Sequence, residues 1–173
     1  MRRLVRIAGG LAACTLTALG LGLGTGGRRL YYNVSVSLPP GWYMCHPVAT
    51  GTVLHRGDLV QFTPPQWVRD ALHRIAPQQA TTPLWMKQLA AMDHDTVCLW
   101  GDDVVINGAV VAHRVLLTTY PLPSLNGCVT LEKNDVFLLG SHAKSFDSRY
   151  TGAWDVQAIE GTCTPLWTWK EGA

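Results

Sequence analysis

The chain has few charged residues: Asp, Glu, Lys and Arg make up 15% of its 173 residues, whereas 47% of the residues are hydrophobic. This balance excludes an extended disordered protein, because there is enough apolar material for a packed core. The formal net charge is only +2, and outside the N-terminus the basic residues are scattered. We therefore expect no nucleic-acid partner.

Patterns of metal ligands are also lacking. The six histidines include no His-x-x-x-His pair, and the five cysteines include no Cys-x-x-Cys pair. Zinc and related metals are usually held by ligands at such spacings. The sequence therefore predicts no metal site and no other cofactor. No internal repeat or low-complexity segment is present, so the length suits one domain plus an anchor.

Residues 7–24 form an uncharged apolar run of roughly the length that crosses a bilayer, preceded by Arg2, Arg3 and Arg6. A cleaved secretory signal is the alternative, because the run is short and rich in small residues. No convincing Ala-x-Ala site follows it. We therefore predict one uncleaved N-terminal transmembrane helix.

The orientation of this span follows from the arginines on its two sides. The three arginines and the amino terminus before it outweigh Arg28 and Arg29 after it. We therefore predict that residues 1–6 are cytoplasmic and that residues 25–173 form a periplasmic domain, held at the bacterial inner membrane.

Short hydrophobic segments separated by turn residues predict that this domain is mainly β. Apolar residues at helical spacing predict one short amphipathic helix over residues 66–75. Asn107-Gly108 lies between two such segments and is typical of a tight hairpin. Strands are expected over residues 59–62, 84–91, 96–99, 104–106, 109–111, 128–131 and 136–139.

A serine, Ser37, lies at the end of a short alternating run, residues 33–37, and only Leu38 separates it from Pro39 and Pro40. The alternation predicts that Ser37 is carried on extended backbone, which the prolines then force to turn. Taken alone, such a segment is typical of a surface turn. A nucleophilic serine is the alternative.

Alternation in the strand over residues 84–91 places Trp85, Lys87 and Leu89 on one face. A lysine on an apolar face commonly extends its amine to water at a sheet edge. The alternative is a buried lysine that acts as a base. This requires a pKa lowered from about 10.4 toward 7 or 8 by desolvation.

A third segment, residues 140–152, contains a Ser-x-Asp-x-Arg-x-x-Gly element. With the serine before proline and the lysine in an apolar strand, in this order behind a membrane anchor, the chain resembles the type I signal peptidase family of serine-lysine proteases. The resemblance covers nearly the whole chain and is strongest to the members that mature conjugative pilin. It implies a compact signal-peptidase-like β domain, whose shallow apolar clefts admit alanine-sized side chains at the cut site.

The resemblance also implies roles for the motif residues. Ser37 matches the nucleophile and Lys87 the general base. Ser35 matches the residue whose hydroxyl forms the oxyanion hole together with the backbone N–H of the nucleophile.

In the third motif, Ser145 matches the residue that hydrogen-bonds the lysine amine. Asp147 matches the residue that orders the site, and Arg149 matches its ion-pair partner. A polar loop with a purely structural ion pair is the alternative for these two. His142 offers a different mechanism, a histidine triad acting on Ser37.

Departures from the housekeeping members of the family bear on the substrate. Those enzymes usually carry methionine after the serine, arginine after the lysine, and Gly-Asp-Asn in the third motif, whereas this chain has Leu38, Gln88 and, at residues 140–142, Gly-Ser-His. We therefore expect a membrane-bound precursor, a conjugative pilin, cut by hydrolysis or closed into a circle by its own amine. A general or narrow-range leader peptidase and a non-enzymatic pilus assembly factor with an inherited site are the alternatives.

The reactive serine is expected to lie near inner-membrane lipid. The chain between Gly24 and Ser37 reaches at most about 43 Å even when fully extended. Trp42 and Tyr43 follow the serine and suit either a lipid interface or the protein core.

The cysteines predict disulfides in an oxidising compartment. Cys98 and Cys128 fall on predicted strands of the same β region and are expected to pair. Cys14 lies in the span, which leaves Cys45 and Cys163 as a second candidate pair. Spacing alone does not determine the connectivity.

Overall fold

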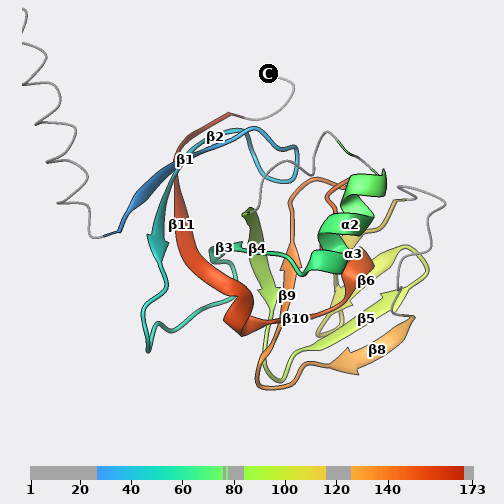
Figure 1. The fold of residues 1–173 in the computed structure, drawn as a ribbon. Coiled ribbons are helices and arrows are strands. Elements are labelled where there is room, and N and C mark those ends of the chain that lie inside the picture. Colours follow the sequence, from blue (N-terminus) through green and yellow to red (C-terminus); the bar gives the residue numbers. More distant parts are fainter. Residues whose placement is uncertain (1–26, 76, 78–83, 116–125, 170–173) are drawn as a thin grey trace, which may run out of the picture.

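The computed structural model describes residues 27–75, 77, 84–115 and 126–169 of the chain (Figure 1). The predicted span over residues 7–24 and the predicted cytoplasmic segment before it lie outside the described residues. Within the described part of the chain, no helix has both the length and the apolar character needed to cross a membrane.

The described residues are mainly β, as the sequence predicts, and form two antiparallel sheets. The larger sheet has the strand order β1-β2-β11-β3-β4-β9-β10, and the smaller one has the order β7-β6-β5-β8. In Figure 1 the β1–β2–β11 end of the large sheet and the small sheet lie on opposite sides of the central strands. The strands of the large sheet are β1 (Arg29–Asn33), β2 (Gly41–Pro47), β11 (Ile159–Thr168), β3 (Leu59–Phe62), β4 (Trp85–Ala91), β9 (Asp135–Leu139) and β10 (Trp154–Asp155).

The small sheet follows the predicted hairpin signal. Asn107 and Gly108 both have positive φ, at 52° and 84°, as a tight two-residue hairpin turn requires. The seven strands expected between residues 59 and 139 are all present, with bounds that agree within two residues. The strands of this sheet are β5 (Thr96–Trp100), β6 (Asp103–Ile106), β7 (Ala109–His113) and β8 (Gly127–Thr130).

The predicted amphipathic helix is confirmed as α2 (Gln66–Ile75). It buries Val68, Ala71 and Leu72 in the main core, which Phe62 also joins. Two shorter helical segments, α3 (Ser148–Thr151) and a 3-10 helix (Val156–Ala158), lie between β9 and β11.

The predicted disulfide and the second candidate pair are both present. Cys98 pairs with Cys128 between β5 and β8, and Cys45 pairs with Cys163 between β2 and β11. In each case the two cysteines lie directly opposite each other in the strand register. The structure therefore decides the connectivity that spacing left open.

A buried carboxylate links the two sheets. Asp95 is 1% exposed and accepts hydrogen bonds from Arg56 Nε (2.7 Å), Asn107 Nδ2 (2.6 Å) and the Met92 N–H (2.9 Å). Burial alone would raise the pKa of Asp95, but these donors outweigh burial and lower it below its usual value. The charged carboxylate therefore ties the β6–β7 turn to the segment before β3.

Candidate active site

The backbone at Ser37 differs from the prediction. β1 ends at Asn33, and Val36 and Ser37 form a turn, so Ser37 does not lie on extended backbone. The buried Asn33 side chain causes this. Its Nδ2 donates to the carbonyl oxygens of Ser35 (3.1 Å) and Leu38 (3.0 Å), and its Oδ1 accepts from the Ser35 N–H (3.1 Å). An asparagine that bonds the backbone ahead of it starts a turn, so the chain turns before the prolines.

Ser35 is held by the same asparagine. Its hydroxyl donates to Asn33 Oδ1 at 2.8 Å, so its proton points toward that side chain. The Ser37 N–H has no hydrogen-bond acceptor among the described residues.

The carbonyl oxygen of Ser37 faces the loop after β9. It accepts from the His142 N–H at 3.5 Å and from Ser141 Oγ at 3.4 Å. Gly140 is enclosed between two parts of the site: a Cβ there would lie 2.2 Å from Ser145 Oγ and 2.6 Å from the Ser37 oxygen. Only glycine fits, and this close packing brings Ser37 and Ser145 together.

Lys87 lies in the middle of β4 and is buried, with 4% of its surface exposed. Its Nζ donates to Ser145 Oγ at 2.9 Å and lies 6.0 Å from the ring centroid of Trp85. Within the described part of the chain, no hydrogen bond joins Lys87 to Ser37. The prediction of a buried lysine beside Trp85 is confirmed, and the alternative of an edge lysine reaching water is excluded.

The environment of Lys87 favours its neutral form. Burial lowers its pKa from the usual 10.5 to about 8, Asp147 opposes this shift and Arg149 adds to it. A substantial fraction of the amine is therefore unprotonated at mildly alkaline pH, as a general base requires.

Asp147 organises the loop beside the lysine. Its Oδ2 accepts from the Gly140 N–H at 2.8 Å. Its Oδ1 accepts from the backbone N–H of Arg149 at 3.2 Å, and this bond caps the N-terminus of α3. Arg149 Nε lies 3.1 Å from the same Oδ1, an ion-pair distance, although the N–H does not point along a hydrogen bond. The predicted ion pair is thus present and fully buried.

The guanidinium of Arg149 also binds backbone. It is 2% exposed, and its two terminal nitrogens donate to carbonyl oxygens inside the protein. These contacts connect the loop after β9 to the end of β7. The carbonyl oxygens that accept from it are those of His113 (3.3 Å), His142 (3.2 Å), Ala143 (3.2 Å) and Gly140.

The ring of His142 takes part in its own loop. Its Nδ1 accepts from the Lys144 N–H at 3.0 Å, and no hydrogen bond from the ring to Ser37 is present among the described residues. Only the backbone of His142 contacts Ser37. The geometry gives no support to a histidine triad.

Sequence reasoning assigned no role to Asn33 or Gly140, although both lie within the motifs it singled out. Asparagine at the end of an alternating run is a turn signal and points to Asn33. Nothing in the sequence marks Gly140, because its neighbours Ser37 and Ser145 meet it only in the folded chain.

Replacing Lys87 with methionine is expected to stabilise the domain near pH 7 by about 2 kcal/mol. Because burial lowers the pKa of Lys87 to about 8, keeping this lysine charged in the folded protein costs about 3 kcal/mol. Methionine removes this cost but also removes the hydrogen bond to Ser145, which offsets about 1 kcal/mol. Below pH 8 Lys87 carries its proton in both the folded and the unfolded chain, so the full cost of burying the charge is present. This cost falls between pH 8 and 10.5 and is absent above pH 10.5. Urea unfolding from pH 6 to 10.5 measures this, and equal stability of both proteins at pH 7 would contradict it.

Comparisons with known proteins agree with the family that the chain resembles. The family model described as "Signal peptidase, peptidase S26" matches residues 4–168. The "Plasmid transfer protein TraF" of Escherichia coli is 29% identical over 180 residues, covering 97% of this chain and 99% of that protein. A crystal structure of a signal peptidase I from Enterococcus faecalis is 20% identical and covers 64% of this chain and 97% of its own, with a TM-score of 0.39, too low to support a structural argument.

Proposed function

The chain belongs to the signal peptidase, peptidase S26 family, and on that premise we propose that Lys87 activates Ser37 to cut a membrane-bound precursor protein. The observation that carries this proposal is the buried Lys87 amine, held by Ser145 2.9 Å away and beside the glycine that packs on Ser37. A lysine in this state takes a proton from a serine hydroxyl near neutral pH.

The proposed reaction has two steps. Neutral Lys87 accepts the Ser37 proton while Ser37 Oγ bonds to the substrate carbonyl carbon. The carbon–nitrogen bond then breaks, and the Lys87 ammonium returns the proton to the leaving amine. Water, or an amine of the substrate itself, next gives a proton to Lys87 and bonds to the ester carbon. The carbon–Oγ bond breaks, and Lys87 returns the proton to Ser37 Oγ.

Charge develops on the substrate carbonyl oxygen in both steps and needs hydrogen-bond donors already in place. We assign these to the Ser37 N–H, which has no acceptor within the described residues, and to the Ser35 hydroxyl. Ser35 acts in this way once its hydroxyl rotates away from Asn33 Oδ1.

We assign Ser145, Asp147 and Arg149 to positioning. Ser145 directs the lysine amine. Asp147 and Arg149 bind the N–H and the carbonyl of Gly140, respectively. A shift of about 1 Å in such a site can reduce turnover about 100-fold, so the ion pair serves structure and catalysis together.

A cluster of exposed aromatic side chains supports a position at the inner membrane, with the domain in the periplasm. Tyr32 packs on Trp42 at 4.8 Å and on Trp169 at 6.0 Å between ring centroids, and Trp167, 70% exposed, adjoins Trp169. Such rings collect at lipid interfaces. Trp42 suits the interface, whereas Tyr43 is 1% exposed and belongs to the core. The disulfides fit the oxidising periplasm.

We propose a conjugative pilin precursor as the substrate, because the relative from Escherichia coli is named for plasmid transfer. The acyl-enzyme then has two possible fates, a linear product through attack by water or a circular product through attack by the amine of the pilin. A leader peptidase of general or narrow range and a non-enzymatic assembly factor are the competing functions.

Mass spectrometry of the candidate pilin from cells with and without Ser37→Ala tests the proposal. Cells with intact Ser37 should contain the shortened pilin, and a circular product would be lighter than the linear one by one water. Ser37→Ala cells should contain only the precursor and should lose transfer. Normal pilin and normal transfer in the Ser37→Ala cells would favour the assembly factor instead.

A further inference from the structure

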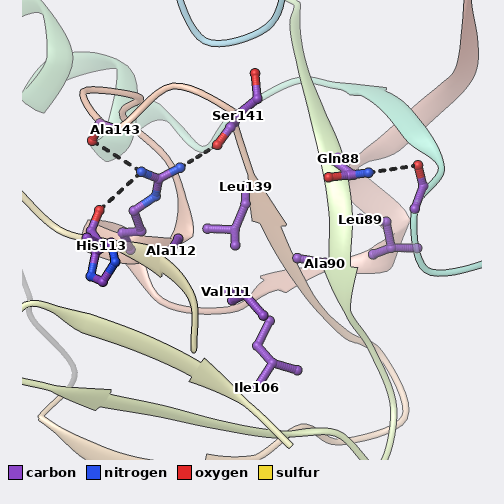
Figure 2. A pocket seen from close by; sticks show the side chains of 13 residues that line it. Gln88, Leu89, Ala90, Ile106, Val111, Ala112, His113, Leu139, Ser141 and Ala143 are labelled. Atoms are coloured by element: carbon purple, nitrogen blue, oxygen red, sulfur yellow. Dashed lines mark hydrogen bonds between the residues drawn. The ribbon is translucent and has the colours of Figure 1, made fainter. Parts of the chain in front are cut away.

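A cavity of about 470 Å³ lies between strands β4 and β9 of the large sheet and the β6–β7 hairpin of the small one. Figure 2 shows side chains from both sheets around it, with Gln88 on the β4 side and His113 on the β7 side. Its walls are mostly apolar. The apolar side chains that line it include Ala90, Ile106, Val111, Ala112 and Leu139.

The cavity adjoins the proposed active site through the start of the loop after β9. Gln88, which lines it, directly follows Lys87 on β4, and its side chain lies on the opposite face of the strand. Gly140 is also in its lining, and a Cβ added there would meet the Ser37 oxygen and the Ser145 hydroxyl. The next lining residue, Ser141, donates to that same Ser37 oxygen. The cavity therefore begins beside the backbone of Ser37, within reach of a residue next to the bond that is cut.

The two sides of Lys87 along β4 differ. On the side toward the start of the strand, Met86 packs with Leu38, the residue after Ser37, and with Tyr43 in a filled cluster. On the other side, Gln88 and Ala90 border open space. The filled side leaves room for only a small side chain, so it suits the alanine-sized substrate residue that the family resemblance implies before the cut. The open side is then the place for the residue after the cut.

The charges of the cavity indicate what it accepts. None of the 13 lining residues is Asp or Glu. The Arg149 guanidinium is engaged by backbone carbonyls and lies beside Asp147. The His113 ring bonds Asp103 through Nδ1 at 2.7 Å, outside the lining. Apolar walls without a carboxylate favour an apolar side chain over an ammonium group.

We propose that this cavity binds the apolar side chain of the first residue on the amine side of the bond that is cut. The inference rests on the proposed function and adds a specificity site to it. The same site selects the amine that leaves during acylation and the amine that attacks the acyl-enzyme. In the latter step a carbon–nitrogen bond forms, the carbon–Oγ bond breaks, and Lys87 passes the amine proton to Ser37 Oγ.

The test uses the full chain in detergent and labelled peptides with alanines before the cut and Gly, Ala, Leu or Phe directly after it. The unchanged protein should cleave the Leu and Phe peptides about 10-fold more efficiently, in kcat/KM, than the Gly peptide. Ala112→Phe fills the cavity from β7 and should remove this preference, lowering kcat/KM for Leu about 10-fold and leaving Gly within about 2-fold. Capture of the acyl-enzyme by added leucinamide or glycinamide should show the same change.

Val110→Phe is the matched control, because Val110 lies on the same strand, is 55% exposed and is outside the lining. It should keep the preference. Ala90→Leu fills the cavity from β4 and should act like Ala112→Phe, so the test does not depend on the folding of one variant. Equal cleavage of the Gly, Leu and Phe peptides by the unchanged protein would overturn the inference but not the proposed function. The same holds if Ala112→Phe and Ala90→Leu both keep the preference for Leu and Phe. Cleavage of none of the peptides would overturn the proposed function as well.

Discussion

Ser37→Ala and Lys87→Met should each lower turnover of the precursor by roughly 10⁴-fold or more. The serine variant lacks the atom that attacks. The lysine variant lacks the base, while its fold should be at least as stable, as argued from the pKa of Lys87. Loss of activity in a more stable protein separates catalysis from folding, because a merely structural lysine would affect both together. Release of the cleaved fragment from a labelled precursor measures the turnover.

The double variant distinguishes a catalytic pair from two independent residues. Side chains that act as one unit are not additive, so Ser37→Ala with Lys87→Met should be scarcely worse than either alone. His142→Ala is the control: its ring bonds only the Lys144 N–H in the described residues, and its backbone N–H remains. It should keep most of the turnover. Loss to the level of Ser37→Ala, in a folded His142→Ala protein, would restore the triad.

The pH profile provides a second readout of the same assignment. Lys87 must be neutral to accept the proton, and its pKa is about 8. Turnover should therefore rise about 10-fold per pH unit below pH 8 and level off above it. A profile governed by histidine would level off near pH 6.5 instead.

Gly140→Ala should reduce turnover by roughly 100-fold and cost about 1–3 kcal/mol of stability. The added methyl group would lie 2.2 Å from Ser145 Oγ and 2.6 Å from the Ser37 oxygen, both far below contact distance. The loop cannot move aside easily, because Asp147 holds the Gly140 N–H and Arg149 holds its carbonyl. The methyl group must therefore displace Ser37 or Ser145 from Lys87.

Gly101→Ala is the matched control for this prediction. Nothing lies within 4 Å of a Cβ at Gly101, and its φ of +59° makes alanine there somewhat strained. It should cost about 1 kcal/mol of stability and leave turnover nearly unchanged. Kinetics of both variants at equal folded concentration decide the outcome. Full turnover in Gly140→Ala would mean that Ser37 and Ser145 need not be held so closely.

By itself the sequence determined the features that depend on neighbouring residues. The helix Gln66–Ile75 and the strands around Lys87 follow from apolar spacing within each segment, and Asn107-Gly108 carries its own turn geometry. The order of the motifs around Ser37 and Lys87 indicated the family, which the comparison with family models confirms. These patterns involve residues that are close in sequence, so they can be recognised without knowledge of the fold.

Only the tertiary structure decided how the segments meet. Asn33 ends β1 early because its side chain bonds carbonyls that lie near it only once the turn has formed. Gly140 is indispensable because Ser37 and Ser145 approach it from different parts of the chain. The pKa of Lys87 falls because strands distant in sequence exclude water from it. Burial and close packing are properties of residues brought together by folding, so spacing along the chain cannot predict them.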